Sequence, residues 1–153
     1  MNYLDSLYWI HERSKFGIKP GVKRMEWMLE QFNNPQDKIR GIHVGGTNGK
    51  GSTVAYLRTA LVENGYDVGT FTSPFIESFN ERISLNGTPI TNDEIVDLVE
   101  RVKPVSEALE NETELGGATE FEIITTMMFL YFGETHPVDF VIIEAGLGIK
   151  HDS

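Results

Sequence analysis

The chain has 153 residues, of which 40% are hydrophobic and 24% charged, as is ordinary for one globular domain with its own core. It contains no cysteine, which excludes disulfides and thiolate zinc sites. The formal net charge of −10 argues against broad binding to nucleic acid or to a membrane surface, so we expect neither as a partner. The N-terminus lacks the long apolar core of a secretory signal, and we expect a cytoplasmic protein.

Basic residues nevertheless gather in one N-terminal stretch of this acidic chain. Residues 13–24 contain Arg13, Lys15, Lys19, Lys23 and Arg24. An acidic protein that binds a polyanion has to do so at a local basic site. This stretch is therefore a candidate for such a site.

Two helices separated by a loop are predicted before the first strand. Residues 3–12 form the first, an amphipathic helix with Leu4, Leu7, Tyr8 and His11 at helical spacing. Glycine and proline turn residues 14–21 into a loop. Met25 and Met28 mark the apolar face of the second helix, which ends before Pro35. We interpret the methionines as core residues and His11 as a boundary residue rather than a metal ligand.

A glycine-rich stretch over residues 45–52 follows a short strand pattern at 39–44 and precedes a helix pattern. Glycines let the backbone approach an anion closely, and the start of a helix adds unpaired N–H donors. Lys50 adds a mobile cation, and the hydroxyls of Ser52 and Thr53 can reach a phosphate or a metal. The stretch is thus typical of a phosphate-binding loop.

This glycine-rich stretch departs from the strict G-x-x-x-x-G-K-[ST] pattern at two positions. Val44 stands where the pattern has glycine, and Gly51 stands where it has serine or threonine. A glycine-rich turn with a solvated lysine is the alternative interpretation. The strand before the turn and the helix after it favour phosphate binding.

Two further strand patterns, over residues 68–72 and 138–143, end in polar residues. Ser73 follows the first and Glu144 follows the second. Strands joined through helices are parallel, and ligands of such sheets bind outside the carboxyl ends of the strands. An acid in that position is suited to hold Mg²⁺ directly or through water. The alternative for Glu144 is an exposed acid at a strand end.

A small hairpin and two capping boxes complete the pattern. Residues 82–85 and 89–90 flank an Asn-Gly turn, which predicts the hairpin. Thr91 with Glu94, and Thr119 with Glu122, have the spacing of capping boxes, and each predicts the start of a helix.

Taken in order along the chain, these motifs resemble one protein family. The segments GTNGKGS at 46–52, Ser-Pro at 73–74 and EAGLG at 144–148 are similar to those of folylpolyglutamate synthase/dihydrofolate synthase, the folate branch of the Mur ligase superfamily. KFGIKPG at 15–21 resembles the substrate loop of that family, and TEFE at 119–122 resembles its Thr-x-Phe-Glu segment.

The resemblance implies an α/β fold of the P-loop NTPase type, with a mostly parallel sheet and helices on both faces. It implies that residues 1–153 form the N-terminal part of the Mur ligase-like ATP-binding domain. The remainder of that domain and a C-terminal glutamate-binding domain are then absent from this chain. On this basis we expect the chain alone to be an inactive fragment.

The chemistry that the resemblance implies is ATP-dependent amide formation. The carboxylate of a folate or of dihydropteroate attacks the γ-phosphate of ATP and becomes an acyl phosphate. The amine of L-glutamate then displaces phosphate. ATP and Mg²⁺ are the implied cofactors, and the protein mainly positions the reactants and neutralises charge.

The resemblance also assigns roles to residues. It makes Lys50 and Glu144 catalytic and places Mg²⁺ on Ser73 and Glu144. ATP is bound by Asn48, Gly49, Lys50, Gly51, Ser52 and Thr53. The pterin substrate lies along Gly17, Ile18, Lys19, Pro20, Thr119, Glu120, Phe121, Glu122 and Asp152. For Glu122 the capping box alone is an equally good explanation.

Two other functions remain open at this point. Another Mur-type amino-acid ligase would share the phosphate loop, although the Lys-Phe-Gly-Ile-Lys-Pro-Gly stretch favours the folate branch. A nucleotide-binding fragment without catalysis belongs to a different functional class. A regulatory GTPase is disfavoured because the chain has no Asn-Lys-x-Asp motif.

Overall fold

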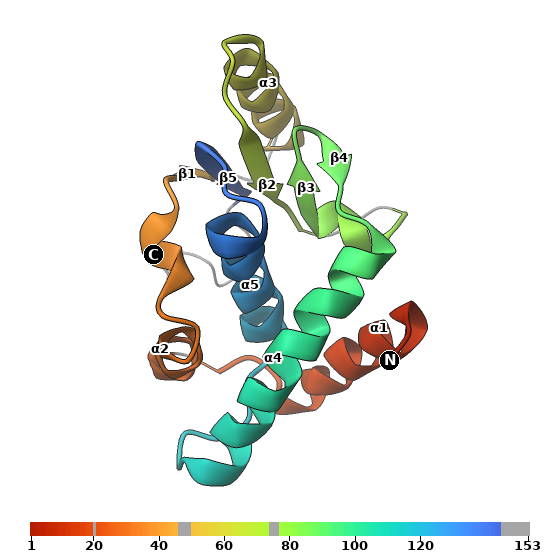
Figure 1. The fold of residues 1–153 in the computed structure, drawn as a ribbon, viewed down its shortest axis with the longest axis vertical. Helices are drawn as coiled ribbons and strands as arrows, with labels where there is room; N and C mark the ends of the chain where they lie inside the picture. The colour runs from red at the N-terminus through yellow and green to blue at the C-terminus, as the bar shows by residue number, and fades with distance from the viewer. Residues whose placement is uncertain (20, 46–49, 74–76, 145–153) are drawn as a thin grey trace.

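The computed structural model of the chain describes residues 1–19, 21–45, 50–73 and 77–144, with the backbone alone for 50–52 (Figure 1). Its α-helices are α1 (Tyr3–Glu12), α2 (Lys23–Glu30), α3 (Lys50–Glu63), α4 (Asn92–Glu112) and α5 (Glu120–Leu130). Its strands are β1 (Gly41–Val44), β2 (Val68–Phe71), β3 (Ile83–Leu85), β4 (Thr88–Pro89) and β5 (Phe140–Glu144). Short helical turns are η1 (Arg13–Phe16), η2 (Pro35–Lys38), η3 (Phe79–Arg82) and η4 (Tyr131–Thr135).

The five strands form one sheet in the order β1-β5-β2-β3-β4. β5 is parallel to both β1 and β2, whereas β3 and β4 extend the sheet as an antiparallel hairpin. β1 and β2 flank α3 in the chain as predicted, but β5 lies between them in the sheet. The nearly continuous apolar run of β5 fits this interior position, where both faces are covered.

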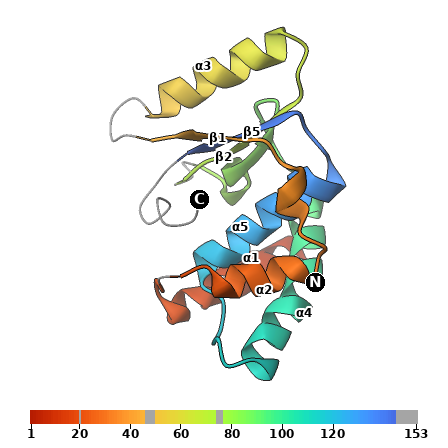
Figure 2. The ribbon, with the colours of Figure 1, turned by 90° about the vertical axis from the view of Figure 1, so that its left-hand side faces the viewer.

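Helices cover both faces of the sheet, which confirms the predicted α/β architecture. Figure 2 shows α3 on one face of the sheet and α5 on the other, with α1, α2 and α4 farther from the sheet than α5. Side chains of β5 alternate between the two sides: Ile142 joins Val54 of α3 in a small core, whereas Val141 and Ile143 join the large core. Both cores therefore meet along one central strand.

Both predicted capping boxes are present. Thr91 and Glu94 begin α4, and Thr119 and Glu122 begin α5, each with reciprocal side-chain-to-backbone bonds. Satisfying these N–H groups fixes where each helix starts. As a result, the positions of Glu120 and Phe121, in the first turn of α5, are fixed relative to the sheet.

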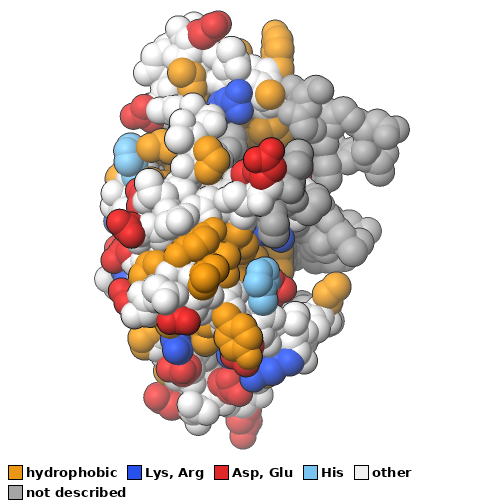
Figure 3. Space-filling view, turned by 90° about the vertical axis from the view of Figure 1, so that its right-hand side faces the viewer, with side chains coloured by type: hydrophobic (Ala, Val, Ile, Leu, Met, Phe, Trp, Pro, Cys, Tyr) orange, Lys and Arg blue, Asp and Glu red, His pale blue; other side chains and the backbone are white. Residues whose placement is uncertain are grey.

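α1 has the bounds predicted for the first helix, residues 3–12, but Leu4 and Tyr8 of the predicted stripe are not on its buried face. Leu4 and Tyr8 are 73% and 69% exposed, whereas Ser6, Trp9 and Ile10 are buried. The helix packs against α4 and α5, and this orientation buries a large indole and an isoleucine together. Hydrophobic side chains consequently remain exposed on the side of the molecule that carries α1 (Figure 3). Among the described residues, none of the helices is both long and apolar enough to cross a bilayer.

Candidate active site

A pocket of about 300 Å³ lies where the loop after α1, the end of β2 and the start of α5 meet. It contains five residues that the sequence assigned to substrate or metal: Gly17, Ile18, Ser73, Glu120 and Phe121. Ser14, Arg82 and Ile124 complete its lining. Three segments that are distant in the chain therefore converge on one cavity.

One side of this pocket is apolar and aromatic. Ile124 is 3% exposed and follows Phe121 by one helical turn. The Phe121 ring packs against the ring of Phe71 on β2, with 6.4 Å between centroids. Such a wall suits a flat heteroaromatic ring.

Ser73 and Glu144 come together at the carboxyl edge of the sheet. β2 and β5 are parallel neighbours with Phe71 opposite Ile143, so both chains leave the sheet at the same level. The backbone N–H of Ser73 donates to Oε1 of Glu144 over 2.9 Å, and Glu144 is 8% exposed. A carboxylate and a hydroxyl are hard oxygen donors of the kind that Mg²⁺ prefers. The donor set of this pair therefore fits a magnesium ion.

Arg82 adds a cation to the same corner of the pocket. Its Nη1 donates to the Ser73 hydroxyl over 3.1 Å, and its guanidinium lies 5.6 Å from the centre of the Phe79 ring. Burial lowers the pKa of Arg82 from its ordinary value, and the negative charge of Glu120 opposes that effect. Arginine nevertheless remains charged in proteins. The pocket thus holds a fixed positive group beside the proposed metal ligands.

Glu120 is held from outside the pocket by His11 of α1. The His11 Nδ1 lies 2.8 Å from Oε2 of Glu120, and their side chains are 50% and 27% exposed. From the sequence, His11 is interpreted as a boundary residue because no partner with metal-ligand spacing lies nearby. A partner 109 positions away leaves no local pattern. The contact fixes the carboxylate on the pocket wall.

Three other residues assigned to the substrate are engaged in the protein itself. Thr119 and Glu122 are buried, and their capping box is present. Glu122 also forms an ion pair with Arg24. The Lys19 ammonium donates to the carbonyl of Gly117 over 3.2 Å. The capping box at Glu122 is therefore present, and the residue has a second partner in Arg24.

The strand predicted before the phosphate loop and the helix predicted after it are both present. β1 ends at Val44 and α3 begins at Lys50, so Gly51 and Ser52 lie in the first turn of a helix. Thr53 of the same turn is exposed. Four other residues with predicted roles lie outside the described residues, together with the segment 145–148: Pro20, Asn48, Gly49 and Asp152.

The basic stretch at 13–24 is not one open polyanion site. Arg13 is 6% exposed, and its guanidinium lies 4.9 Å from the ring centre of Trp9. Arg24 is buried against Glu122. Together with Lys19, these cations hold the loop after α1 in place. Sequence counts alone could not separate buried cations from solvated ones.

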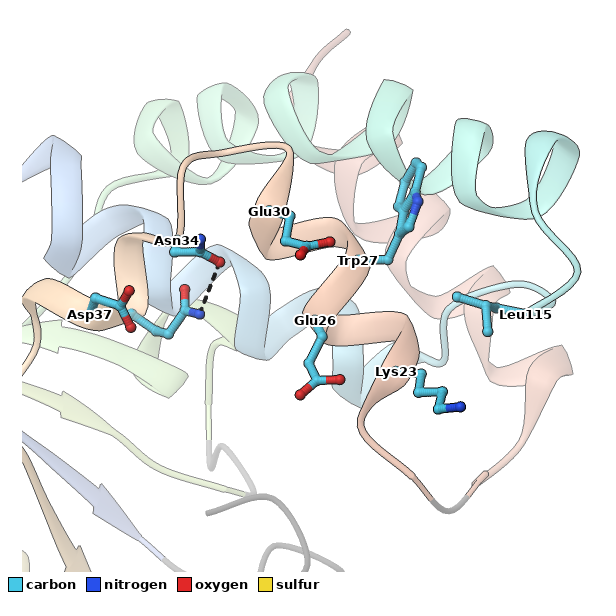
Figure 4. A pocket seen from close by; sticks show the side chains of 8 residues that line it. Lys23, Glu26, Trp27, Glu30, Asn34, Asp37 and Leu115 are labelled. Atoms are coloured by element: carbon cyan, nitrogen blue, oxygen red, sulfur yellow. Dashed lines mark hydrogen bonds between the residues drawn. The ribbon is translucent and has the colours of Figure 1, made fainter.

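A larger hollow of about 590 Å³ lies elsewhere, across α2 and η2 (Figure 4). Its charged lining is mainly acidic, with Glu26, Glu30 and Asp37 against Lys23. None of the residues to which the sequence gave a catalytic, ATP-binding, metal-binding or pterin-binding role lines it. Three carboxylates would repel the phosphates and carboxylates of an anionic substrate. The pocket beside Ser73 is therefore the better candidate.

Sequence reasoning missed three of the lining residues. Ile124 could have been found, because it lies one helical turn beyond Phe121. Ser14 belongs to a loop that was recognised, although its side chain was not singled out. Arg82 was assigned only to a hairpin, and its approach to Ser73 depends on the antiparallel pairing of β2 with β3.

Comparison with known proteins relates this chain to a family. Dihydrofolate synthase/folylpolyglutamate synthase of Bacillus subtilis (strain 168) is 58% identical over 151 residues, covering 99% of this chain and 35% of the relative. The apo form of folylpolyglutamate synthase from L. casei superposes with a TM-score of 0.88 at 38% identity, covering 97% of this chain and 36% of that one. A folylpolyglutamate synthase complexed with AMPPCP and folate has a TM-score of 0.84 at 37% identity, covering 97% and 36%.

No protein-family model matches the chain. The chain spans about a third of the length of the curated relatives it matches. Sequence and structure nevertheless agree along nearly all of its residues, including the elements that build the pocket. The chain therefore belongs to the folylpolyglutamate synthase/dihydrofolate synthase family and corresponds to an N-terminal portion of its members.

Proposed function

We propose that the chain provides the nucleotide and pterin sites of an ATP-dependent ligase that joins L-glutamate to a folate, to dihydropteroate or to both. One observation carries this proposal. Phe121 and Ser73 line the same pocket at the carboxyl edge of the sheet, and the backbone N–H of Ser73 contacts the Glu144 carboxylate. α3, which follows β1 of that sheet in the chain, begins with Lys50. A planar substrate and the phosphates of ATP can therefore meet there.

The relatives support this assignment of ligands. One of the solved structures contains AMPPCP, an analogue of ATP, together with folate. On the basis of the resemblance in sequence, we assign Asn48 through Thr53 to the binding of ATP. We assign Gly17 through Pro20, Thr119 through Glu122, and Asp152 to the pterin substrate. Residues 1–153 then form part of the ATP-binding domain of the ligase.

The proposed reaction has two steps. A carboxylate oxygen of the pterin substrate attacks the γ-phosphorus, the bond to the β,γ-bridging oxygen breaks, and ADP leaves. The glutamate amine then attacks the acyl carbonyl, loses a proton, and phosphate leaves as the amide forms. Lys50 and the N-terminus of α3 offset the charge that develops on the phosphates. Arg82 offers a cation for the substrate carboxylate.

Ser73 and Glu144 are the residues of this chain that would hold Mg²⁺. Glu144 contributes a buried carboxylate, and Ser73 contributes a hydroxyl that already accepts from Arg82. When bound, Mg²⁺ neutralises phosphate oxygens and orients them for in-line transfer. The guanidinium of Arg82 must share or release the Ser73 hydroxyl for that oxygen to serve as a ligand.

The test is a chimaera in which residues 1–153 replace the matching segment of the B. subtilis relative. Circular dichroism and thermal unfolding, compared with the unmodified relative, establish that the chimaera folds. We expect ATP use that depends on folate or dihydropteroate, and a product heavier by one glutamate residue. Running the two acceptors separately shows which one this chain accepts.

One outcome would contradict the proposed function. A folded chimaera that binds ATP but forms no glutamylated product with either acceptor would show that these residues do not support ligation. That result would favour the alternative of nucleotide binding without catalysis.

A further inference from the structure

Arg24 of α2 forms a buried ion pair with Glu122 of α5. Its Nε lies 2.9 Å from Oε1 of Glu122, and its Nη2 lies 2.9 Å from Oε2. The two side chains are 11% and 7% exposed. Two parallel bonds between a guanidinium and a carboxylate fix orientation as well as distance. The pair therefore holds α2 and the first turn of α5 in one arrangement.

The same guanidinium also contacts the substrate loop. Nη2 of Arg24 donates to the backbone carbonyl of Lys19 over 3.2 Å. Lys19 directly follows Ile18, which lines one side of the pocket. Glu122 directly follows Phe121, which lines another side. One cation therefore binds the immediate neighbours of both walls, although it lies on neither.

Gly117 provides a second connection between the same two segments. A Cβ built on Gly117 would lie 2.3 Å from the ring of Phe16, so only glycine lets the ring approach this closely. The Lys19 ammonium donates to the Gly117 carbonyl and lies 4.9 Å from the centre of the Phe16 ring. The loop after α1 is thus held against the residues just before α5 at several points.

We propose that Arg24 is a positioning residue for the pterin site. Through Glu122 and the Lys19 carbonyl, it sets the spacing between the wall at Ile18 and the wall at Phe121. The proposal rests on the proposed function. Binding geometry is sensitive to small displacements, so loosening one wall should weaken acceptor binding first. ATP binding should change little, because α3 lies on the opposite face of the sheet (Figure 2).

Three variants of the chimaera test this role in graded steps. Arg24→Lys keeps the charge but loses the two-pronged geometry and the reach to the Lys19 carbonyl. Arg24→Met keeps the apolar stem and removes the charge. Glu122→Gln keeps an acceptor for the Thr119 N–H and removes the ion pair. Arg101→Met is the matched control, because it removes an ion pair that is more exposed. The side chains of Arg101 and Glu134 in that pair are 35% and 31% exposed.

The first measurement is steady-state kinetics. For Arg24→Met we expect the KM for the acceptor to rise roughly 10- to 100-fold, with the KM for ATP changed less than about threefold. Arg24→Lys should raise the KM for the acceptor less than Arg24→Met does, and Arg101→Met should leave both KM values unchanged. Equal changes in both KM values, or a loss of thermal stability with an unchanged acceptor KM, would show a merely structural role and overturn the proposal.

Hydrogen exchange provides a readout that needs no turnover. Arg24→Met and Glu122→Gln should both speed the exchange of backbone amides at residues 14–19, while those of β5 stay protected. Unchanged exchange at 14–19 in both variants would contradict the positioning role. If the unmutated chimaera shows no acceptor-dependent turnover, the proposed function fails. The exchange result then still decides whether Arg24 holds the loop.

Discussion

Glu144 is a buried carboxylate with a defined partner, and this makes its role testable at the level of single atoms. Its Oε1 accepts from the Ser73 N–H, and Ser73 in turn accepts from Arg82. Burying a charge without compensation is costly, so such a group is retained where it binds a partner or a metal. The backbone N–H of Ser73 supplies part of that compensation.

Glu144→Gln should separate the structural contribution of this residue from the metal role. The amide keeps the shape and an oxygen acceptor for Ser73, so we expect the fold to persist. The Mg²⁺ concentration at half-maximal ATP use by the chimaera should rise by about tenfold or more, the scale of substitutions at metal sites. Glu134→Gln is the control. An unchanged Mg²⁺ midpoint would show that Glu144 is not a ligand.

Lys50→Ala tests the phosphate loop. Lys50 is the first residue of α3, where the helix N-terminus already favours an anion. Losing the cation should weaken ATP binding or phosphoryl transfer by about 2–4 kcal/mol. Titration with a nucleotide analogue and single-turnover kinetics measure the two effects separately. Lys38→Ala, at an exposed lysine, is the control; wild-type affinity and turnover in Lys50→Ala would refute the assignment.

At the scale of elements, the start of α4 combines a cap with a long-range bond. Glu94 accepts from the Thr91 N–H over 2.9 Å and from the Tyr131 hydroxyl over 2.8 Å. Burial pushes the pKa of Glu94 up, but these bonds, the Thr91 hydroxyl and the charge of His136 outweigh it and lower the pKa overall. Burial and the bond to Glu94 raise the pKa of Tyr131.

The lowered pKa of Glu94 predicts a pH-dependent contribution to stability. An acid whose pKa is lowered by folding stabilises the fold at pH values above its unfolded pKa, about 4.3. That contribution is lost as the pH falls through the pKa of the folded state. Glutamine can still cap, so Glu94→Gln should cost about 0.5–1 kcal/mol at pH 7 through the lost charge. Denaturant unfolding at pH 7 and in acid should show this difference shrink. Glu107→Gln, on the same helix, should show no such trend.

The contact between β2 and η4 depends on the absence of a side chain at Gly69. A Cβ there would lie 2.5 Å from the ring of Phe132, which is 1% exposed and cannot move away freely. Gly69→Ala should therefore destabilise the fold by about 1–3 kcal/mol, the usual cost of overpacking. Gly41→Ala is the matched control, because its nearest atom is a methyl of Ile143 at 3.3 Å. Equal free energies of unfolding for both variants would contradict this account.

For the whole molecule, β5 is the strand on which both cores depend. It pairs with β1 and β2 and contributes to the cores on both faces. A backbone amide in the most densely packed part of a core exchanges only when a large part of the structure opens, and such opening has the highest free energy. We expect the amides of β5 to exchange most slowly and those of the β3–β4 hairpin to exchange much faster. Hydrogen exchange followed by mass spectrometry measures this order; equal rates would refute it.

Local patterns in the sequence were enough to predict most elements of the fold. Apolar strand patterns located β1, β2 and β5, and the spacing of threonine and glutamate located the starts of α4 and α5. These predictions were correct because hydrophobic periodicity, helix capping and turn preferences depend on residues only a few positions apart. The same patterns placed Ser73 and Glu144 at one sheet edge, where the structure brings them into contact.

Folding decided the partners that are distant in the chain. The ion pair of Arg24 with Glu122 spans 98 positions, and the contact of His11 with Glu120 spans 109. No local spacing encodes such pairs, because their approach depends on how α1, α2 and α5 pack together. The inward face of α1 was missed for the same reason: its orientation follows from the area buried against α4 and α5. The sequence alone therefore establishes the elements, the family resemblance and the candidate chemistry, whereas packing establishes which charges are buried and which residues border the pocket.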